Sequence, residues 1–191
     1  MSEQSLLESL SRLLAERDFK TKRALGRQIE ADVAGDRDAV GSILLGGADD
    51  ATKIALLEIV GSTERAEFDD AVRRTLESGA REEVLQTAAT ALGKLHSPIA
   101  FDILTALLRH KSPNVRLGAI YGLMAHGDSR AIAHLAEHLD DRDSARSWWP
   151  SPKAGGYRIG AEASAAIDSL SGTRLGGDRR RIQEWIDRHS R

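Results

Sequence analysis

The sequence of 191 residues contains no cysteine, which excludes disulfides, thiol catalysis and the cysteine-based zinc and iron–sulfur sites. Aromatic residues are scarce at 4%, so the apolar content is carried mainly by Leu, Ala and Ile, which favour helices. No apolar run approaches the length of about 18 residues that a membrane-spanning helix needs. The first residues lack a basic end followed by an apolar block, so no secretion signal is expected.

Charge of neither sign is in large excess. The chain has 27 Lys and Arg against 29 Asp and Glu, a net charge of −2, and this balance disfavours a general nucleic-acid binder. Hydrophobic residues make up 41% of the chain, which is enough to build a buried core. These features predict a folded cytoplasmic protein that has no membrane segment.

An internal repeat is the strongest pattern in the sequence. Apolar or small residues recur at i, i+4 and i+8, which indicates one face of a helix. The following positions align at a spacing of 31 residues: Val84, Ala88 and Leu92 with Val115, Ala119 and Leu123. Each repeat reads as two antiparallel helices joined by a short turn, and no alternating strand pattern is present. The small residue in the middle of each face is expected to let a neighbouring helix approach closely.

Helix boundaries are marked by local signals. Ser97-Pro98 and Ser112-Pro113 each place a capping hydroxyl before a proline, which predicts that a helix starts there. Gly127 is a predicted helix end, and Asp128-Ser129 is expected to open the next helix.

The repeats predict one all-α domain over residues 1–191, an α-solenoid of helical hairpins with capping helices. Its expected parts are degenerate N-terminal helices and a cap over 1–49, repeats over 50–79, 80–111, 112–143 and 157–190, and an insertion loop over 144–156.

Two stretches carry a family resemblance. The segment from Ser112 to Leu123, with Val115-Arg116 near its start, and the run from His126 to Ile132 resemble the bacterial HEAT-like repeats, including those named after phycobilisome lyases. The resemblance covers about residues 50–190. It implies HEAT-like hairpins, while the scaffold itself hosts many unrelated functions.

The resemblance also implies that the second helix of each pair lines the concave side. The groove would then present Asp69, Arg73, Glu77, Asp102, Thr105, Arg109, His134, Glu137 and His138. This mixture of charges suits a protein or peptide better than a nucleic acid. His134 and His138 are spaced like a metal-chelating pair, but no third ligand is placed beside them. We therefore predict no metal.

The insertion concentrates aromatic and basic residues. The candidate partner-binding residues there are Arg146, Trp148, Trp149, Lys153, Tyr157 and Arg158. Insertions in solenoids form loops on one face, often the binding face, and Trp beside Arg is typical of interface hot spots. Two interpretations stay open: Trp148 and Trp149 are exposed anchors, or they fill a widened gap between repeats. A second basic stretch, over 17–37, is a solvated helix face or a patch for an acidic partner.

The sequence thus predicts a non-enzymatic protein-binding module, such as an adaptor or the immunity or regulatory partner of another bacterial protein. We expect no catalytic residue and no cofactor. One alternative is a lyase-like enzyme of the bilin lyase HEAT type, whose residues no sharp motif would mark. The other is a HEAT-like nucleic-acid-binding protein, which the excess of acids over residues 49–83 disfavours.

Overall fold

The computed structural model describes residues 2–146 and 156–189. Within these residues the chain is mainly α-helical, which confirms the all-α prediction, and it also forms one small sheet. The helices of the first half are α1 (Glu3–Ala15), α2 (Phe19–Val33), α3 (Arg37–Leu45), α4 (Asp50–Ser62), the 3-10 helix η1 (Ala66–Phe68), α5 (Asp69–Glu77) and α6 (Glu82–Lys94). The second half contains α7 (Ala100–Leu107), α8 (Pro113–His126), α9 (Ala131–Ala136), β1 (Ser144–Ala145), β2 (Tyr157–Arg158), α10 (Ile159–Ser171) and α11 (Arg179–His189).

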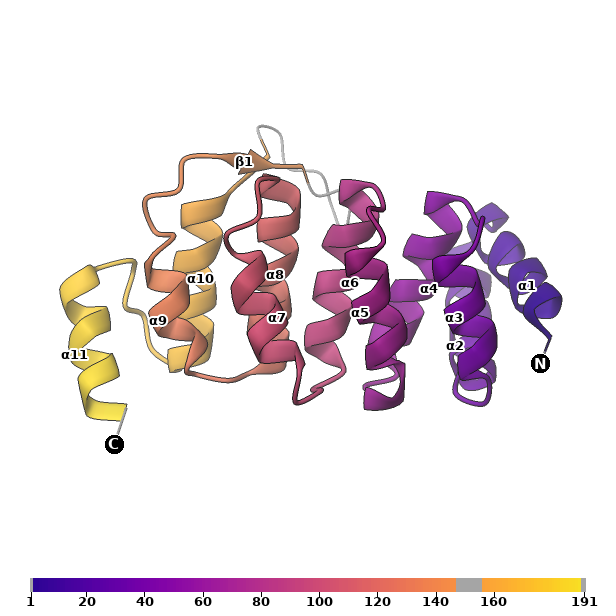
Figure 1. Ribbon diagram of the computed structural model, residues 1–191, viewed down its shortest axis with the longest axis horizontal. Coiled ribbons are helices and arrows are strands. Elements are labelled where there is room, and N and C mark those ends of the chain that lie inside the picture. The colour runs from indigo at the N-terminus through magenta and orange to yellow at the C-terminus, as the bar shows by residue number, and fades with distance from the viewer. Residues whose placement is uncertain (1, 147–155, 190–191) are drawn as a thin grey trace.

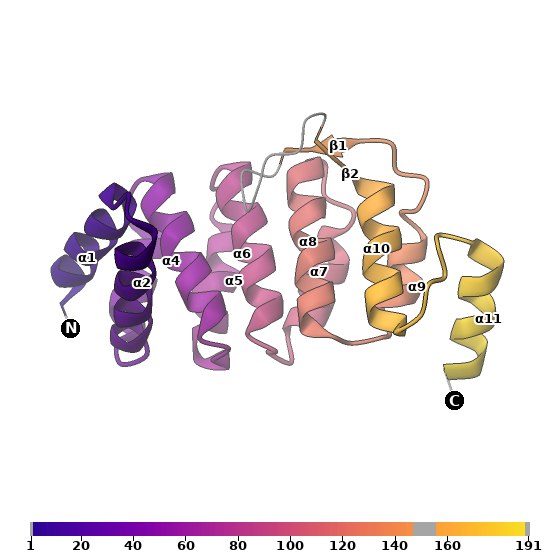
Figure 2. The same cartoon turned by 180° about the vertical axis from the view of Figure 1, so that it is seen from behind.

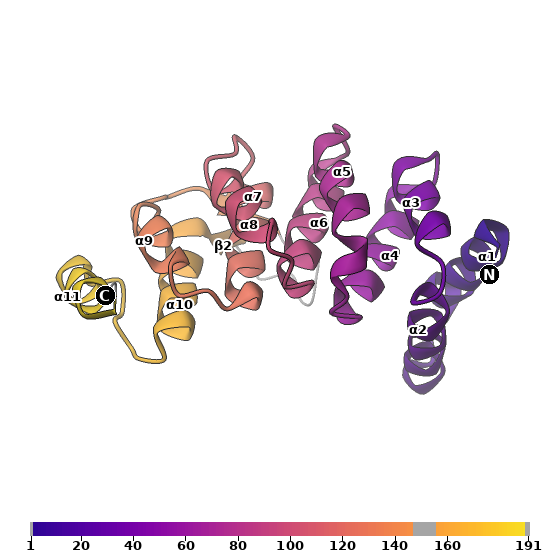
Figure 3. The ribbon, with the colours of Figure 1, turned by 60° about the horizontal axis from the view of Figure 1, so that its bottom comes forward.

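The helices stack into two rows. We call α3, α5, α7 and α9 the outer row, which faces the viewer in Figure 1, and α4, α6, α8 and α10 the inner row, which faces the viewer in Figure 2. The helix α2 extends the inner row at one end, while α1 and α11 lie at the two ends of the stack (Figure 2). Seen from below, the stack forms an arc with the inner row on its hollow side (Figure 3). One continuous core, from Leu6 to Trp185, runs between the rows.

Glycines let the inner-row helices touch through their backbones. A Cβ atom on Gly118 of α8 would stand 2.8 Å from the Cα of Gln86 in α6, and one on Gly93 would stand 2.5 Å from the Cα of Gly122. A residue with a side chain would therefore force these helices apart. The outer-row helices α5, α7 and α9, in contrast, pack chiefly on the inner row rather than on one another. This difference in spacing curves the stack toward the inner row.

The predicted small positions are confirmed as core. Ala88 and Ala119 are fully buried. The closest backbone approaches, however, occur at the glycines of the same helices rather than at these alanines.

Two of the predicted helix boundaries are confirmed. Gly127 ends α8 with a φ of 80°, and its N–H donates to the carbonyl oxygen of Leu123 at 3.1 Å. Pro113 is the first residue of α8, as expected. The hydroxyl of Ser112, however, makes no hydrogen bond to any described residue, so its predicted capping role is wrong.

The start of α7 differs from the prediction. Ser97-Pro98 was expected to open this helix, but α7 begins at Ala100. The reason is that the hydroxyl of Ser97 donates to the carboxylate of Asp69 at 2.7 Å instead of capping its own helix. Ser97 thereby ties the turn between α6 and α7 to the start of α5.

The prediction that no strand is present is wrong for the base of the insertion. β1 and β2 pair antiparallel, with Ser144 opposite Arg158 and Ala145 opposite Tyr157. The helix α10 begins directly after β2. The strand pair therefore holds both ends of the insertion at the edge of the solenoid, beside α8 and α10 (Figures 1 and 2).

Candidate functional site

The expected groove residues lie on the wrong side of the arc. Arg73, Asp102, Arg109 and His134 belong to α5, α7 and α9 or their ends, which form the outer row (Figure 1). The expectation that these helices line the concave side is therefore wrong. The physical reason is that the glycine-containing helices approach most closely, and the more closely packed row takes the hollow side of an arc.

Two of the expected groove arginines, Arg73 and Arg109, are already paired with neighbouring acids. Arg73 donates to Asp70 at 2.6 Å and to Glu77 at 2.8 Å, and its hydrogen bond to Asp70 is the main reason why the pKa of Arg73 is raised. Arg109 pairs with Glu137 at 3.0 Å, and this hydrogen bond lowers the pKa of the Glu137 carboxyl. At these two positions the outer row therefore presents compensated charge.

The two histidines of the predicted pair do not share a helix face. α9 ends at Ala136, so His138 lies in the turn that follows. The ring of His134 instead lies edge-on to Phe101, with 5.9 Å between centroids. Burial lowers the pKa of His138, against the opposite charges of Asp141 and Glu137. Among the residues that the structure describes, no three His, Cys, Asp or Glu side chains are grouped so that they could hold a metal ion.

Equivalent positions of successive inner helices carry polar side chains. Glu58 of α4, Thr90 of α6 and Tyr121 of α8 follow one another at the repeat spacing, and each is partly exposed. Each lies on the side of its helix opposite to the buried apolar positions, as the helical period of 3.6 residues requires. We call these residues, together with Lys94 and Glu162, the inner-face set.

Neighbouring inner helices are linked through these side chains. The hydroxyl of Thr90 donates to the carbonyl oxygen of Gln86 at 3.1 Å and lies 3.5 Å from that of Gly118. The hydroxyl of Tyr121 donates to the carboxylate of Glu162 in α10 at 3.1 Å. Burial, followed by the charge of Glu162, raises the pKa of Tyr121, so this phenol stays protonated as a hydrogen-bond donor.

Glu58 lies between two lysines. Burial raises the pKa of its carboxyl, while the positive charges of Lys94 on α6 and Lys22 on α2 oppose that rise. A Cβ atom on Gly61 would stand 3.3 Å from the Cδ of Lys94, so the stem of this lysine passes over α4. The inner face thus alternates in charge along its length.

The insertion is anchored to the inner row by Asn114, which is near the start of α8. Its side-chain oxygen accepts a hydrogen bond from the backbone N–H of Arg146 at 2.8 Å. Its amide nitrogen donates to Glu82, at the start of α6, at 3.2 Å. Asn114 therefore positions the chain leaving β1 over the N-terminal ends of two inner helices.

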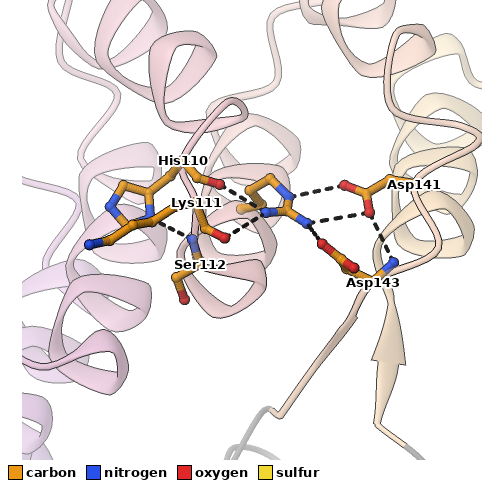
Figure 4. Close-up of polar contacts among 6 residues, drawn as sticks. His110, Lys111, Ser112, Asp141 and Asp143 are labelled. Carbon is orange, nitrogen blue, oxygen red and sulfur yellow. Dashed lines mark hydrogen bonds and ion pairs between the residues drawn. The ribbon is translucent and has the colours of Figure 1, made fainter.

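Arg116 fixes the segment that leads into β1 (Figure 4). Its guanidinium is nearly buried and donates to Asp141 at 3.0 Å and to Asp143 at 2.6 Å. It also donates to the backbone carbonyl oxygens of His110 at 2.8 Å and Lys111 at 3.2 Å. One side chain thus connects the turn before α8 with the chain entering the hairpin.

The remaining candidate residues divide into three groups. Arg146 and Arg158 are exposed at the strand pair. Tyr157 is only 6% exposed and belongs to the core rather than to a contact surface. Trp148, Trp149 and Lys153 lie outside the described residues.

Comparison with protein families agrees with this architecture. Residues 70–149 match the family model for HEAT repeats. The fold is a HEAT-like α-solenoid. The matched region runs from α5 to the insertion and includes the glycine contacts of α6 and α8, Arg116 and both of its acidic partners. A search of curated proteins found no match. In the described part of the chain, no helix is both long enough and apolar enough to cross a membrane.

Proposed function

We propose that this HEAT-like solenoid is a non-enzymatic protein-binding module of the cytoplasm, an adaptor or the immunity or regulatory partner of another bacterial protein. The observation that supports this proposal most directly is the inner-face set. HEAT repeats commonly bind proteins, and here the inner helices, which lie on the hollow side of the arc (Figure 3), carry partly exposed polar side chains at equivalent positions.

The packing behind the inner face favours binding. Because α6 and α8 contact each other through Gly93, Gly118 and Gly122, the side chains between them are carried on a closely packed backbone. Such preorganisation reduces the entropy lost when a partner docks. The hydroxyls of Thr90 and Tyr121 and the alternating charges offer hydrogen bonds of both kinds, which suits an extended peptide or a polar protein surface.

The insertion forms the second part of the proposed surface. Arg146 and Arg158 are exposed where the hairpin leaves the solenoid, and Trp148, Trp149 and Lys153 belong to the same segment of sequence. Arg116 and Asn114 fix the base of this hairpin against α8. In this proposal the partner contacts the inner face and the hairpin together, while the outer row faces away from it.

Two charge-reversal variants test this proposal. Lys94 on the inner row and Arg74 on the outer row are both exposed, and neither is ion-paired with any described residue. We expect a stoichiometric protein captured from the native lysate by the wild type to be retained by Arg74→Glu and lost with Lys94→Glu. Equal retention by both variants would contradict the inner-face proposal. A bound pigment in the absorption spectrum, with no protein partner, would instead favour the lyase-like alternative.

A further inference from the structure

A separate surface is formed by the first half of α2. The stretch over 17–27 contains five bases, Arg17, Lys20, Lys22, Arg23 and Arg27, and every one of them is exposed. None forms an ion pair with an acid among the described residues. Elsewhere several arginines pair with an acid close by in the sequence, as Arg73 and Arg130 do. The positive charges of this stretch are therefore not balanced by ion pairs.

Among the described residues, the most exposed large apolar side chain lies in the same place. Phe19, the first residue of α2, is 75% exposed. Arg23 and Arg27 follow it at i+4 and i+8, so the three share one face of the helix, and Lys20 lies beside them. We call Phe19, Lys20, Arg23 and Arg27 the α2 stripe. At about 1.5 Å per residue, it extends over about 12 Å.

The helix is held so that the stripe faces solvent. Ile29 and Val33, in the second half of α2, are buried and attach that half of the helix to the core. Asp18 fixes the helix start by accepting hydrogen bonds from the backbone N–H of Thr21 at 2.9 Å and from its hydroxyl at 2.8 Å. Phe19 is therefore exposed at a defined position, where burying it on a partner would be favourable.

We propose that the α2 stripe is a docking surface for an acidic protein segment that carries an apolar side chain, which contacts Phe19 while the acids pair with Arg23 and Arg27 further along the helix. Charge complementarity with unpaired bases would supply specificity and association rate, and the contact with Phe19 would supply apolar burial. This surface is distinct from the inner-face set and does not depend on the function proposed for that set.

Two other partners fit the stripe less well. A helix that lies in a membrane surface needs an apolar face of several residues, but the apolar side of α2 is packed on the core and leaves Phe19 alone. A nucleic acid places phosphates along a longer path than the stripe covers, and the next turn of α2 brings the acids Glu30 and Asp32.

The test uses the full chain and a fluorescein-labelled peptide of about twelve residues, long enough to cover the stripe. The peptide is rich in glutamate and has leucines one helical turn apart, and a second peptide has serine in place of leucine. Binding is measured by fluorescence anisotropy at low and at physiological salt. We expect the Arg23→Glu, Arg27→Glu double variant to weaken binding of the leucine peptide about tenfold or more. The neutral Arg23→Gln, Arg27→Gln pair should give a smaller loss in the same direction.

Phe19→Ala should weaken binding of the leucine peptide severalfold and leave the serine peptide unaffected, because only the first peptide offers an apolar contact. The matched control is Arg74→Glu, Lys111→Glu, which changes net charge equally at exposed positions outside α2 and should bind as the wild type does. An equal loss in this control would overturn the proposal, since it would show a response to net charge alone. Tighter binding to phosphatidylserine-containing vesicles or to a single-stranded oligonucleotide would overturn it as well. Lys94→Glu should leave peptide binding unchanged, which separates this surface from the inner face.

Discussion

The inner-row helices α6 and α8 approach each other far more closely than the outer-row helices α5 and α7 do. Between the inner helices, glycine at 93, 118 and 122 leaves room only for backbone. On the outer row, the charged side chains of Arg73 and Arg109 pair with exposed acids. The inner row is therefore sensitive to added side-chain volume, whereas the outer row tolerates it.

Arg116→Ala should have the largest effect on stability. It removes the cation from Asp141 and Asp143 and leaves the carbonyl groups of the preceding turn without their donor. Losing one partner of a buried ion pair lowers the free energy of unfolding by about 3–5 kcal/mol, which urea denaturation measures. A loss comparable with that of an exposed surface pair would mean that Arg116 does not stabilise the hairpin base.

Gly118→Ala and Gly41→Ala should change stability in opposite directions. A Cβ at position 118 meets the backbone of Gln86, whereas one at position 41, in the outer helix α3, would have no atom within 4 Å apart from the adjoining backbone of its own helix. Overpacking should lower the free energy of unfolding by about 1–3 kcal/mol in the first variant. Greater helix propensity should raise it by roughly 0.5–1 kcal/mol in the second. Thermal melts of the two variants compare the rows directly, and equal shifts would contradict the difference in spacing.

Glu58 and Glu137 should give opposite dependences on pH. Burial raises the pKa of Glu58, so its ionised form destabilises the fold, and stability falls as pH rises through the range between its unfolded and folded pKa values. Glu58→Gln should remove this dependence and raise the melting temperature at neutral pH. The hydrogen bond from Arg109 lowers the pKa of Glu137, so its stabilising contribution is lost as pH falls through the folded value. Melting temperatures of both Gln variants from acidic to neutral pH test the signs.

Arg109→Ala should have the smallest effect. Its pair with Glu137 has both side chains more than half exposed, at 73% and 54%. Such pairs contribute about 0.2–1 kcal/mol to the free energy of unfolding, and less at high salt. Urea denaturation at low and high salt checks this value, and a loss similar to that of Arg116→Ala would show that the outer row is not the tolerant side.

Local patterns in the sequence predicted most of the fold. The spacing of Val84, Ala88 and Leu92 indicated the buried helix face, and Gly127 indicated the end of α8. A helix face and a helix end are each determined by residues that are close in sequence, so local patterns reveal them. The concave side was assigned wrongly since a periodic array of helices does not itself show which row is inner. Gly93 and Gly118, which interrupt otherwise good helices, were the available signal for close approach.

The candidate site was less predictable because it depends on contacts between distant residues. Nothing in the sequence near Arg116 indicates Asp141 and Asp143, since the three meet only after two helices have folded back. The early end of α9, which separates His134 from His138, has no glycine or proline to mark it. The sequence also did not show that Tyr121 belongs to the inner face. Its hydroxyl contacts Glu162 of α10, and that contact forms only in the folded chain.

Because of the strand pair, the segment between β1 and β2 can be replaced without changing the solenoid. Ala145 and Tyr157 stand opposite each other, so the chain between them starts and ends at fixed neighbouring points whatever its length. Closing a flexible loop of twice the length disfavours folding by only about 0.6 kcal/mol more. New segments, including libraries for display, can therefore be grafted between these strands while the repeats on either side keep their stacking.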